Sequence, residues 1–140
     1  MLAGDQGREA GAVLLGKTTM PDYGMLSSGL SSFHKLARNP WNLSKNPGGS
    51  SAGAGAAAAA GYGPLHIGTD IGGSIRLPAG WCGVFGLKPT YGRLPRTGSY
   101  PFVASFDHLG PFARSAHDLA LAYDAMQGPD ADDPACAQRT

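Results

Sequence analysis

The amino-acid sequence predicts an α/β fold that is not complete in itself. Short apolar runs beside glycines alternate with segments that have the composition of helices, and this alternation is typical of α/β architecture. The 22 glycines and 11 prolines cluster in turns without a repeat period, which leaves few residues for regular elements. We therefore expect these 140 residues to form the inner part of something larger.

Three short apolar segments are predicted to be strands. The first, Ala-Val-Leu-Leu at residues 12–15, is a continuous apolar run bounded by glycines, which is the pattern of a buried strand. The segments 65–68 and 84–87 are predicted as strands on the same grounds. The three strands alternate with helical segments along the chain.

The most regular helix is predicted over residues 115–127. Ser115 is placed to cap it, Asp118 lies at the third helical position, and apolar residues recur on one face. A second helix, residues 52–60, consists of Ala and Gly, with Ser50 or Ser51 as its N-cap and Gly61 at its end. Shorter helices are expected at 75–82 and 32–37, and the polar segment from residue 128 is expected to be irregular.

Composition excludes several classes of protein. The net charge is +1 with no basic block, which argues against nucleic-acid binding. The longest uncharged stretch, residues 52–69, is too weakly apolar to span a bilayer, so no membrane partner is expected. The two cysteines, Cys82 and Cys136, show no metal-ligand spacing, and we expect a reduced, cytoplasmic protein without a metal or cofactor.

Three short serine or lysine motifs match known sites but lack their context. Gly-Ala-Val-Leu-Leu-Gly-Lys-Thr, residues 11–18, fits the phosphate-binding P-loop, yet its variable positions belong to a strand and no helix follows. Residues 49–53 fit the nucleophile elbow with Ser51 as nucleophile, but the preceding residues do not resemble the required strand, and His66, His108 and His117 lack supporting context. Residues 32–35 fit Ser-x-x-Lys without its partner motifs.

Two glycine turns carry a stronger signal, because both place a serine directly after Gly-Gly. They are residues 46–53, Asn-Pro-Gly-Gly-Ser-Ser-Ala-Gly, and residues 68–76, Gly-Thr-Asp-Ile-Gly-Gly-Ser-Ile-Arg. Such glycines let backbone N–H groups converge on a point where an oxyanion can be stabilised. Serine needs a base, and a desolvated lysine can serve, because burial lowers the pKa of an ammonium group. Lys17, at the end of an apolar run, is placed for that role.

These segments, together with residues 11–24, resemble the amidase signature family over nearly the whole chain. The resemblance implies a three-layer α/β/α sandwich around a mixed β-sheet. It also implies an amidase that hydrolyses a carboxylic amide through a Ser–Ser–Lys triad, with Ser74 as nucleophile, Ser50 as bridging serine and Lys17 as buried base. The peptide bond Gly49–Ser50 is expected to be cis, as in the family.

The resemblance also implies supporting groups. Ser51, Asp70 and Arg76 match polar positions of the signature, and a purely structural Asp70–Arg76 pair stays open as an alternative. The implied oxyanion hole consists of the backbone N–H groups of Ile71, Gly72, Gly73 and Ser74. The expected partner is a small-molecule amide substrate; the oligomeric state is open, with a homodimer of the parent protein as one option.

Two departures bear on function. The glutamine-using A-type subunits of tRNA amidotransferases have glutamine where this chain has Leu77, and they have Met-Asp-Glu where this chain has Met-Pro-Asp at residues 20–22. Both favour a stand-alone amidase over such an amidotransferase component.

Family members are several times longer, so residues 1–140 are expected to be a partial amidase signature domain with 128–140 as a polar tail. An inactive fragment is the third alternative.

Overall fold

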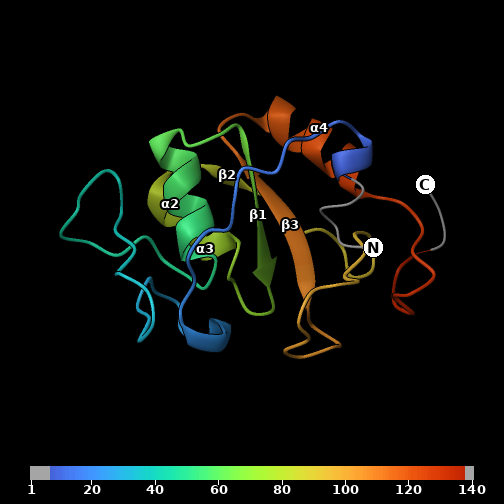
Figure 1. Ribbon diagram of the computed structural model, residues 1–140, viewed down its shortest axis with the longest axis horizontal. Helices are drawn as coiled ribbons and strands as arrows, with labels where there is room; N and C mark the ends of the chain where they lie inside the picture. Colours follow the sequence, from blue (N-terminus) through green and yellow to red (C-terminus); the bar gives the residue numbers. More distant parts are fainter. Residues whose placement is uncertain (1–6, 138–140) are drawn as a thin grey trace.

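The computed structural model describes residues 7–137, which fold into helices packed on both faces of a small sheet (Figure 1). The α/β class predicted from the sequence is confirmed. In chain order, the elements are the 3-10 turn η1 (Asp22–Gly24), α2 (Ala52–Ala60), β1 (Leu65–Asp70), α3 (Arg76–Cys82), β2 (Phe85–Gly86), β3 (His108–Ala113) and α4 (Ala116–Met126).

The sheet has three strands in the order β1-β3-β2. Both pairs are antiparallel, and the long pair runs from Leu65 opposite Ala113 to Asp70 opposite His108. The central strand β3 was not predicted, because Gly110 and Pro111 interrupt its apolar pattern. Within the described residues the sheet is thus antiparallel throughout. This register brings the end of β1 beside the start of β3.

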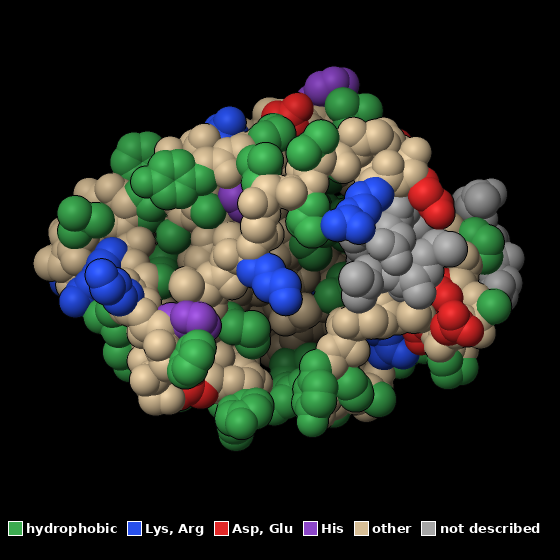
Figure 2. All heavy atoms as spheres, viewed as in Figure 1, with side chains coloured by type: hydrophobic (Ala, Val, Ile, Leu, Met, Phe, Trp, Pro, Cys, Tyr) green, Lys and Arg blue, Asp and Glu red, His purple; other side chains and the backbone are tan. Residues whose placement is uncertain are grey.

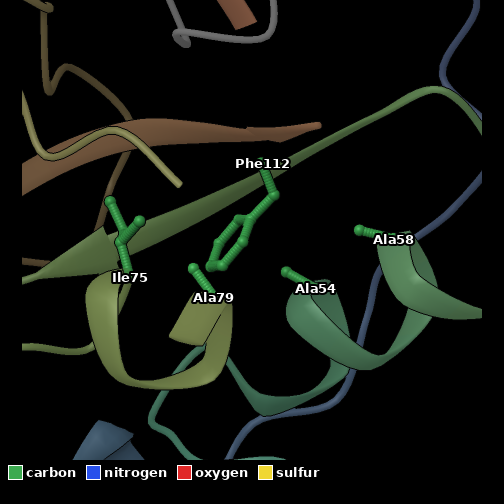
Figure 3. Packing of buried hydrophobic residues seen from close by; sticks show 5 residues of the cluster. All are labelled: Ala54, Ala58, Ile75, Ala79 and Phe112. Carbon is green, nitrogen blue, oxygen red and sulfur yellow. The ribbon is translucent and has the colours of Figure 1, made fainter. Parts of the chain in front are cut away.

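One face of the sheet packs against α2 and α3. Phe112 of β3 is fully buried and points toward both helices, where it meets Ala54 and Ala58 of α2 and Ala79 of α3, with Ile75 beside them (Figure 3). The small side chains of α2 let the helix approach the ring closely. The small side chains of this predicted helix thus leave the space that one large aromatic side chain fills.

The other face of the sheet packs against α4. Leu109 lies an odd number of positions from Phe112 and so points to the opposite side of β3. It forms a second buried cluster with Leu94 and Met126, against which Tyr123 packs. The arrangement of a helix layer, a sheet and a second helix layer agrees with the expected α/β/α organisation.

The predicted helices begin and end close to where the sequence places them. Ser115 Oγ accepts a hydrogen bond from the Asp118 N–H, as a capping serine should. Gly61 ends α2 in the left-handed conformation with φ 80°. Ser51 occupies the N-cap position of α2 without a side-chain capping bond, because its hydroxyl is used elsewhere.

Two predicted elements are wrong. Residues 12–15 form no strand: they pair with no strand among the described residues and run past the start of α2, where the Thr19 C=O accepts a hydrogen bond from the Gly53 N–H. Residues 32–37 form no helix, because the Asp22 carboxylate accepts hydrogen bonds from Ser31 Oγ and the Ser32 N–H and holds a turn there. In the segment wrongly predicted as a strand, Val13 is 82% exposed, Leu14 65% and Leu15 78%.

The segment after α4 is irregular up to residue 137, as predicted, yet it is firmly attached. The Asp133 carboxylate accepts two hydrogen bonds from the Arg96 guanidinium, at 2.9 and 2.7 Å, and the Ala137 N–H donates to the Gly92 C=O. This ion pair is largely buried on both sides, with 14% and 3% of the side chains exposed. The tail therefore belongs to the folded unit.

Large apolar side chains remain on the surface. Figure 2 shows hydrophobic side chains over much of one face, and Trp81, Phe85 and Leu121 are each about half exposed. No helix among residues 7–137 has the length and apolar character needed to cross a membrane.

Candidate active site

A cavity of about 710 Å³ opens where the turn after β1 meets the turn before α2. Ser50 and Ser74, from the two Gly-Gly-Ser turns, both line it. The Ser51 N–H donates to the Ser74 C=O at 3.2 Å and so joins the two turns. The fold thus brings together two serines that are distant in the sequence. Apolar side chains supply much of the remaining wall, from Met20, Tyr23, Tyr100, Phe102 and Leu109.

The turn that carries Ser74 is organised by one buried carboxylate. Asp70, 1% exposed, ends β1 and accepts hydrogen bonds from the Gly73 N–H at 2.8 Å and the Ile75 N–H at 3.1 Å. Ser74 lies between these two anchored residues and is partly exposed to the cavity. The Asp70 side chain therefore fixes the backbone on both sides of Ser74 and so restricts where its hydroxyl can lie.

Asp70 also forms an ion pair with Arg76 at the start of α3. The guanidinium donates to both carboxylate oxygens, with Nε and Nη2 each at 3.0 Å. Burial acts to raise the pKa of Asp70, but the hydrogen bonds from Arg76 and from the backbone outweigh it and hold the pKa below its ordinary value. The Arg76 side chain is 54% exposed, so water screens its half of the pair. Asp70 is accordingly ionised at neutral pH.

The turn that carries Ser50 is packed with little spare space. The peptide bond Gly49–Ser50 is cis, as the family resemblance implies. A Cβ at Gly49 would collide with the backbone of Ser28, so only glycine fits there. Ser50 is 4% exposed, and what remains accessible faces the cavity.

Ser51 plays a different part from its neighbour. Its Oγ accepts a hydrogen bond from the Thr69 N–H at 3.0 Å and donates to the Thr69 C=O at 3.2 Å, which ties the start of α2 to β1. Ser51 is 8% exposed and is not among the described residues that line the cavity. A nucleophile elbow needs an exposed hydroxyl, so this arrangement disfavours Ser51 as nucleophile.

A glycine in β1 makes this contact possible. A Cβ at Gly68 would lie 2.5 Å from Ser51 Oγ and 2.7 Å from the ring of Phe112. Gly68 therefore lets the turn that carries Ser51 and the hydrophobic core approach β1 from the same side.

Lys17 is placed differently from the expectation. Its side chain is exposed, and among residues 7–137 no hydrogen bond joins it to Ser50 or Ser74. It is also absent from the described residues that line the cavity. Within residues 7–137 Lys17 is therefore not buried, because the run expected to bury it, residues 12–15, is itself exposed, and its role as a base stays a prediction.

The backbone N–H groups after β1 divide into two kinds. The N–H of Gly73 is committed to Asp70, and Gly73 has φ 130°, a conformation that favours glycine. Ile71 and Ser74 line the cavity on either side of it. Of the four expected oxyanion-hole residues, Gly73 thus donates its N–H to Asp70, and Ile71 and Ser74 are the two that line the cavity.

Sequence reasoning missed several residues of the cavity wall. Tyr23 is the one described non-glycine residue with positive φ, 53°, and it lies at the cavity rim with Tyr100 and Phe102. His108 lines the cavity, although no motif in the sequence marks it as part of a site. No single sequence motif could have identified these residues, because they come from η1, a loop and β3, and only the tertiary fold brings these segments together.

No group of three or more His, Cys, Asp or Glu side chains in the described part of the chain could hold a metal ion. Both cysteines are free and buried, and burial raises the pKa of the Cys82 thiol to about 11. A thiol with that pKa stays protonated near neutral pH and is a poor nucleophile. Neither cysteine is among the described residues that line the cavity, whose polar side chains include Ser50, Ser74 and His108.

Comparison with known proteins shows the family to which the chain is similar. The family model described as Amidase matches residues 5–140. AtzE of Pseudomonas sp. strain ADP, which is one subunit of 1-carboxybiuret hydrolase, is 55% identical over 130 residues, which are 93% of this chain and 28% of that protein. The A-type subunit of the glutamyl-tRNA(Gln) amidotransferase of Alkaliphilus metalliredigens is 53% identical over 88% of this chain and 25% of its own length.

A solved structure shows the same fold. One chain of a vestigial protein complex, studied for the evolutionary origins of an s-triazine catabolic enzyme, superposes with a TM-score of 0.96 at 54% identity. The superposition covers 98% of this chain and 30% of the other. The present chain therefore spans less than a third of the length of the relatives it matches.

Proposed function

Because the chain belongs to the amidase family, the amidase signature enzymes, we propose that it hydrolyses the C–N bond of a carboxylic amide through Ser74, Ser50 and Lys17. One observation carries the proposal: Ser50 and Ser74 line the same cavity, from two turns that a backbone hydrogen bond joins. Cavities lined by apolar side chains with a few convergent polar groups are the usual form of small-molecule sites.

In the proposed reaction, Ser74 Oγ attacks the amide carbonyl carbon while its proton passes to Ser50 Oγ. Ser50 gives its own proton to the neutral amine of Lys17. The C–N bond of the tetrahedral intermediate then breaks, and the proton returns through Ser50 to the leaving nitrogen, which departs as ammonia or an amine. Water hydrolyses the acyl-enzyme, releases the acid and restores Ser74.

The oxyanion of the tetrahedral intermediate needs hydrogen-bond donors. From the four expected N–H groups, we assign this role to Ile71, Gly72 and Ser74, since the Gly73 N–H is donated to Asp70. In this proposal, Asp70 and Arg76 keep the turn in the shape that directs these donors. Preorganised donors of this kind are often the largest single contribution to catalysis.

Lys17 needs a cover that residues 7–137 do not supply. A lysine acts as a base near neutral pH only when desolvation lowers its pKa, and here its side chain is exposed. We therefore propose that the 140 residues are a partial amidase domain, with 128–140 as its tail, inside a longer polypeptide that covers Lys17. The chain's span of 28% of the length of its hydrolase relative supports this.

A second candidate function is that of the A-type subunit of a glutamine-dependent tRNA amidotransferase. Identity to the amidotransferase relative, 53%, is nearly as high as the 55% identity to the hydrolase relative, so overall identity does not separate the two functions. Leu77, which lies near Gly73, stands where such subunits have glutamine, and this favours the stand-alone amidase. Ammonia release from simple amides, without partner proteins, distinguishes the two.

We further propose a cytoplasmic protein that takes a small-molecule amide, with a homodimer as one arrangement of the full-length form. The two buried, free cysteines support a reduced compartment.

The nucleophile is tested by covalent labelling of the full-length protein with a fluorophosphonate. We expect Ser74→Ala to abolish labelling and to lower turnover of an aryl amide by at least about 1000-fold, since the nucleophile itself is lost. The matched variant Ser51→Ala removes a neighbouring serine and should slow turnover while labelling persists. Labelling that survives Ser74→Ala and disappears in Ser51→Ala would reverse the assignment.

A further inference from the structure

We propose that the ion pair between Arg96 and Asp133 positions one wall of the cavity and so determines how tightly a bulky amide binds. The inference rests on the function proposed above and concerns the substrate of that same site. The wall is the loop of residues 96–107, named the wall loop here, which contributes Tyr100 and Phe102 to the cavity lining. Asp133 is not among the described residues that line the cavity, so it is a positioning residue that acts through Arg96.

The wall loop has open space on both of its sides. Its Tyr100 and Phe102 line the cavity that holds the two serines of the site, whereas Pro101 and Ala104 line a second cavity of about 370 Å³. Three residues of the loop line both spaces: Arg96, Ser99 and Asp107. Side chains that face a cavity have few packing partners there, so packing fixes this loop less firmly than it fixes the core. The position of the loop therefore depends on its polar contacts.

Arg96 holds both the start and the middle of the wall loop. Its Nη1 donates to the Ala104 C=O at 2.5 Å and to the Tyr91 hydroxyl at 3.1 Å. The Tyr91 hydroxyl donates to the same carbonyl oxygen at 2.7 Å. Near the start of the loop, the Ser99 N–H donates to the Arg96 C=O at 2.9 Å. A displacement of Arg96 would therefore be transmitted to the loop at two points.

Asp133 in turn fixes Arg96. Its carboxylate accepts hydrogen bonds from the Arg96 N–H at 3.0 Å, from Nε at 2.9 Å and from Nη2 at 2.7 Å. Both side chains are largely buried, so water has little access to replace these contacts. A guanidinium is planar, so binding of Nε and Nη2 to one carboxylate fixes the plane and leaves Nη1 on the opposite edge, where it meets the Ala104 C=O.

The far part of the wall loop is held together from within. The Asp107 carboxylate accepts hydrogen bonds from the Phe102 N–H and the Val103 N–H, both at 3.0 Å. The Phe106 N–H donates to the Val103 C=O at 2.8 Å. Loss of the Arg96–Asp133 pair should therefore shift the loop as a unit and change the shape of the cavity, without unravelling the loop.

The test compares two substrates of different size with the full-length protein, an aryl amide and the small propionamide. Asp133→Asn keeps the shape of the side chain and removes its charge. We expect the KM for the aryl amide to rise about 10-fold while kcat stays within about 2-fold, because a poorly placed wall weakens binding of the bulky group. Both constants for propionamide should stay within about 2-fold. The matched control, Asp132→Asn, removes the neighbouring exposed charge and should change neither substrate's constants.

A double variant guards against misfolding of Asp133→Asn. Arg96→Met combined with Asp133→Leu replaces the pair by apolar side chains of similar size and leaves no buried charge unpaired. Methionine cannot donate to the Ala104 C=O, so the KM for the aryl amide should rise as in the single variant. An unchanged KM in the folded double variant would overturn the proposal. An equal fall of kcat with both amides would also overturn it, because that result indicates a loss of folded protein only.

Hydrogen exchange supplies a readout that needs no turnover. Deuterium uptake by peptides that cover residues 97–107 should increase in Asp133→Asn and in the double variant, and it should stay unchanged in Asp132→Asn. Equal uptake in all four proteins refutes the positioning role. If the unsubstituted protein hydrolyses neither amide, the proposed function fails, and hydrogen exchange alone decides whether the ion pair holds the wall loop.

Discussion

The turn after β1 and the segment before η1 carry the two ends of the proposed proton relay, and they differ in how well the chain holds them. Ser74 lies between Gly73 and Ile75, both anchored to a carboxylate that is 1% exposed. Lys17 follows an apolar run whose side chains are 65–82% exposed. The nucleophile is thus preorganised by local contacts, whereas the base depends on structure that residues 7–137 do not provide.

The largest expected effect concerns the base. We expect residues 1–140 alone to give no measurable turnover of an aryl amide, whereas the full-length protein turns it over, because Lys17 is exposed here and a lysine serves as a base only when it is desolvated. The exposed apolar run and the open edge of β1 should also favour aggregation of the isolated chain. Turnover by the isolated chain that disappears in Ser74→Ala would contradict this prediction. It would show that residues 1–140 hold the segment with Lys17 as well as they hold the turn with Ser74.

A smaller effect is expected when the anchor of the nucleophile turn is removed. Asp70→Ala leaves the buried N–H groups of Gly73 and Ile75 without acceptors, which should lower the free energy of unfolding by about 3 kcal/mol. Chemical denaturation of the full-length protein measures this. The exposed carboxylate of Asp124 on α4 provides the matched control, and Asp124→Ala should change the free energy of unfolding by less than about 0.5 kcal/mol.

The pH dependence of stability sharpens the same contrast. The pKa of Asp70 is lower in the folded state than its ordinary value of 3.8, so its contribution to stability is present above that value and is lost as the pH falls through the folded pKa. We expect the free energy of unfolding to decline in acid below about pH 4 and Asp70→Asn to flatten this decline. An identical acid dependence in both proteins would mean that other carboxylates, such as Asp133, dominate.

The smallest effect is expected at the apolar run. In the isolated chain, Leu15→Ser should change the free energy of unfolding by less than about 0.5 kcal/mol, since this side chain is already 78% exposed. In the full-length protein the same substitution should cost more, provided that a further segment covers residues 12–15. Equal, small effects in both proteins would contradict the proposed cover over Lys17.

The sequence predicted those elements whose signals are local. The helix at 52–60 was found from its small residues and Gly61, and Ser115 marked the start of α4. β3 was missed because proline and glycine are more typical of a turn than of a strand. Pro111 nevertheless occupies a paired position of the β1–β3 ladder. The run at 12–15 was wrongly predicted as a buried strand. An apolar pattern indicates that a segment is suited to burial, but it does not show that residues 7–137 contain the structure that would bury it.

The site was predictable to the same degree. Ser50 and Ser74 each follow Gly-Gly, a visible pattern, and the fold brings both to one cavity. The place of His108 in the cavity wall could not be predicted, since it depends on the register that sets it opposite Asp70. Tyr23 comes from η1, whereas Tyr100 and Phe102 come from one loop before β3, and no spacing in the sequence relates the two segments.

Gly68 has a consequence for how this protein can change in evolution. Any side chain at this position would strike both Ser51 and Phe112, so a mutation there disturbs the start of α2 and the core together. The contact between α2 and β1 is therefore closed to gradual variation. The wall of the cavity is more open to change, because Tyr23 and Tyr100 are 83% and 91% exposed and exchange there leaves the core untouched.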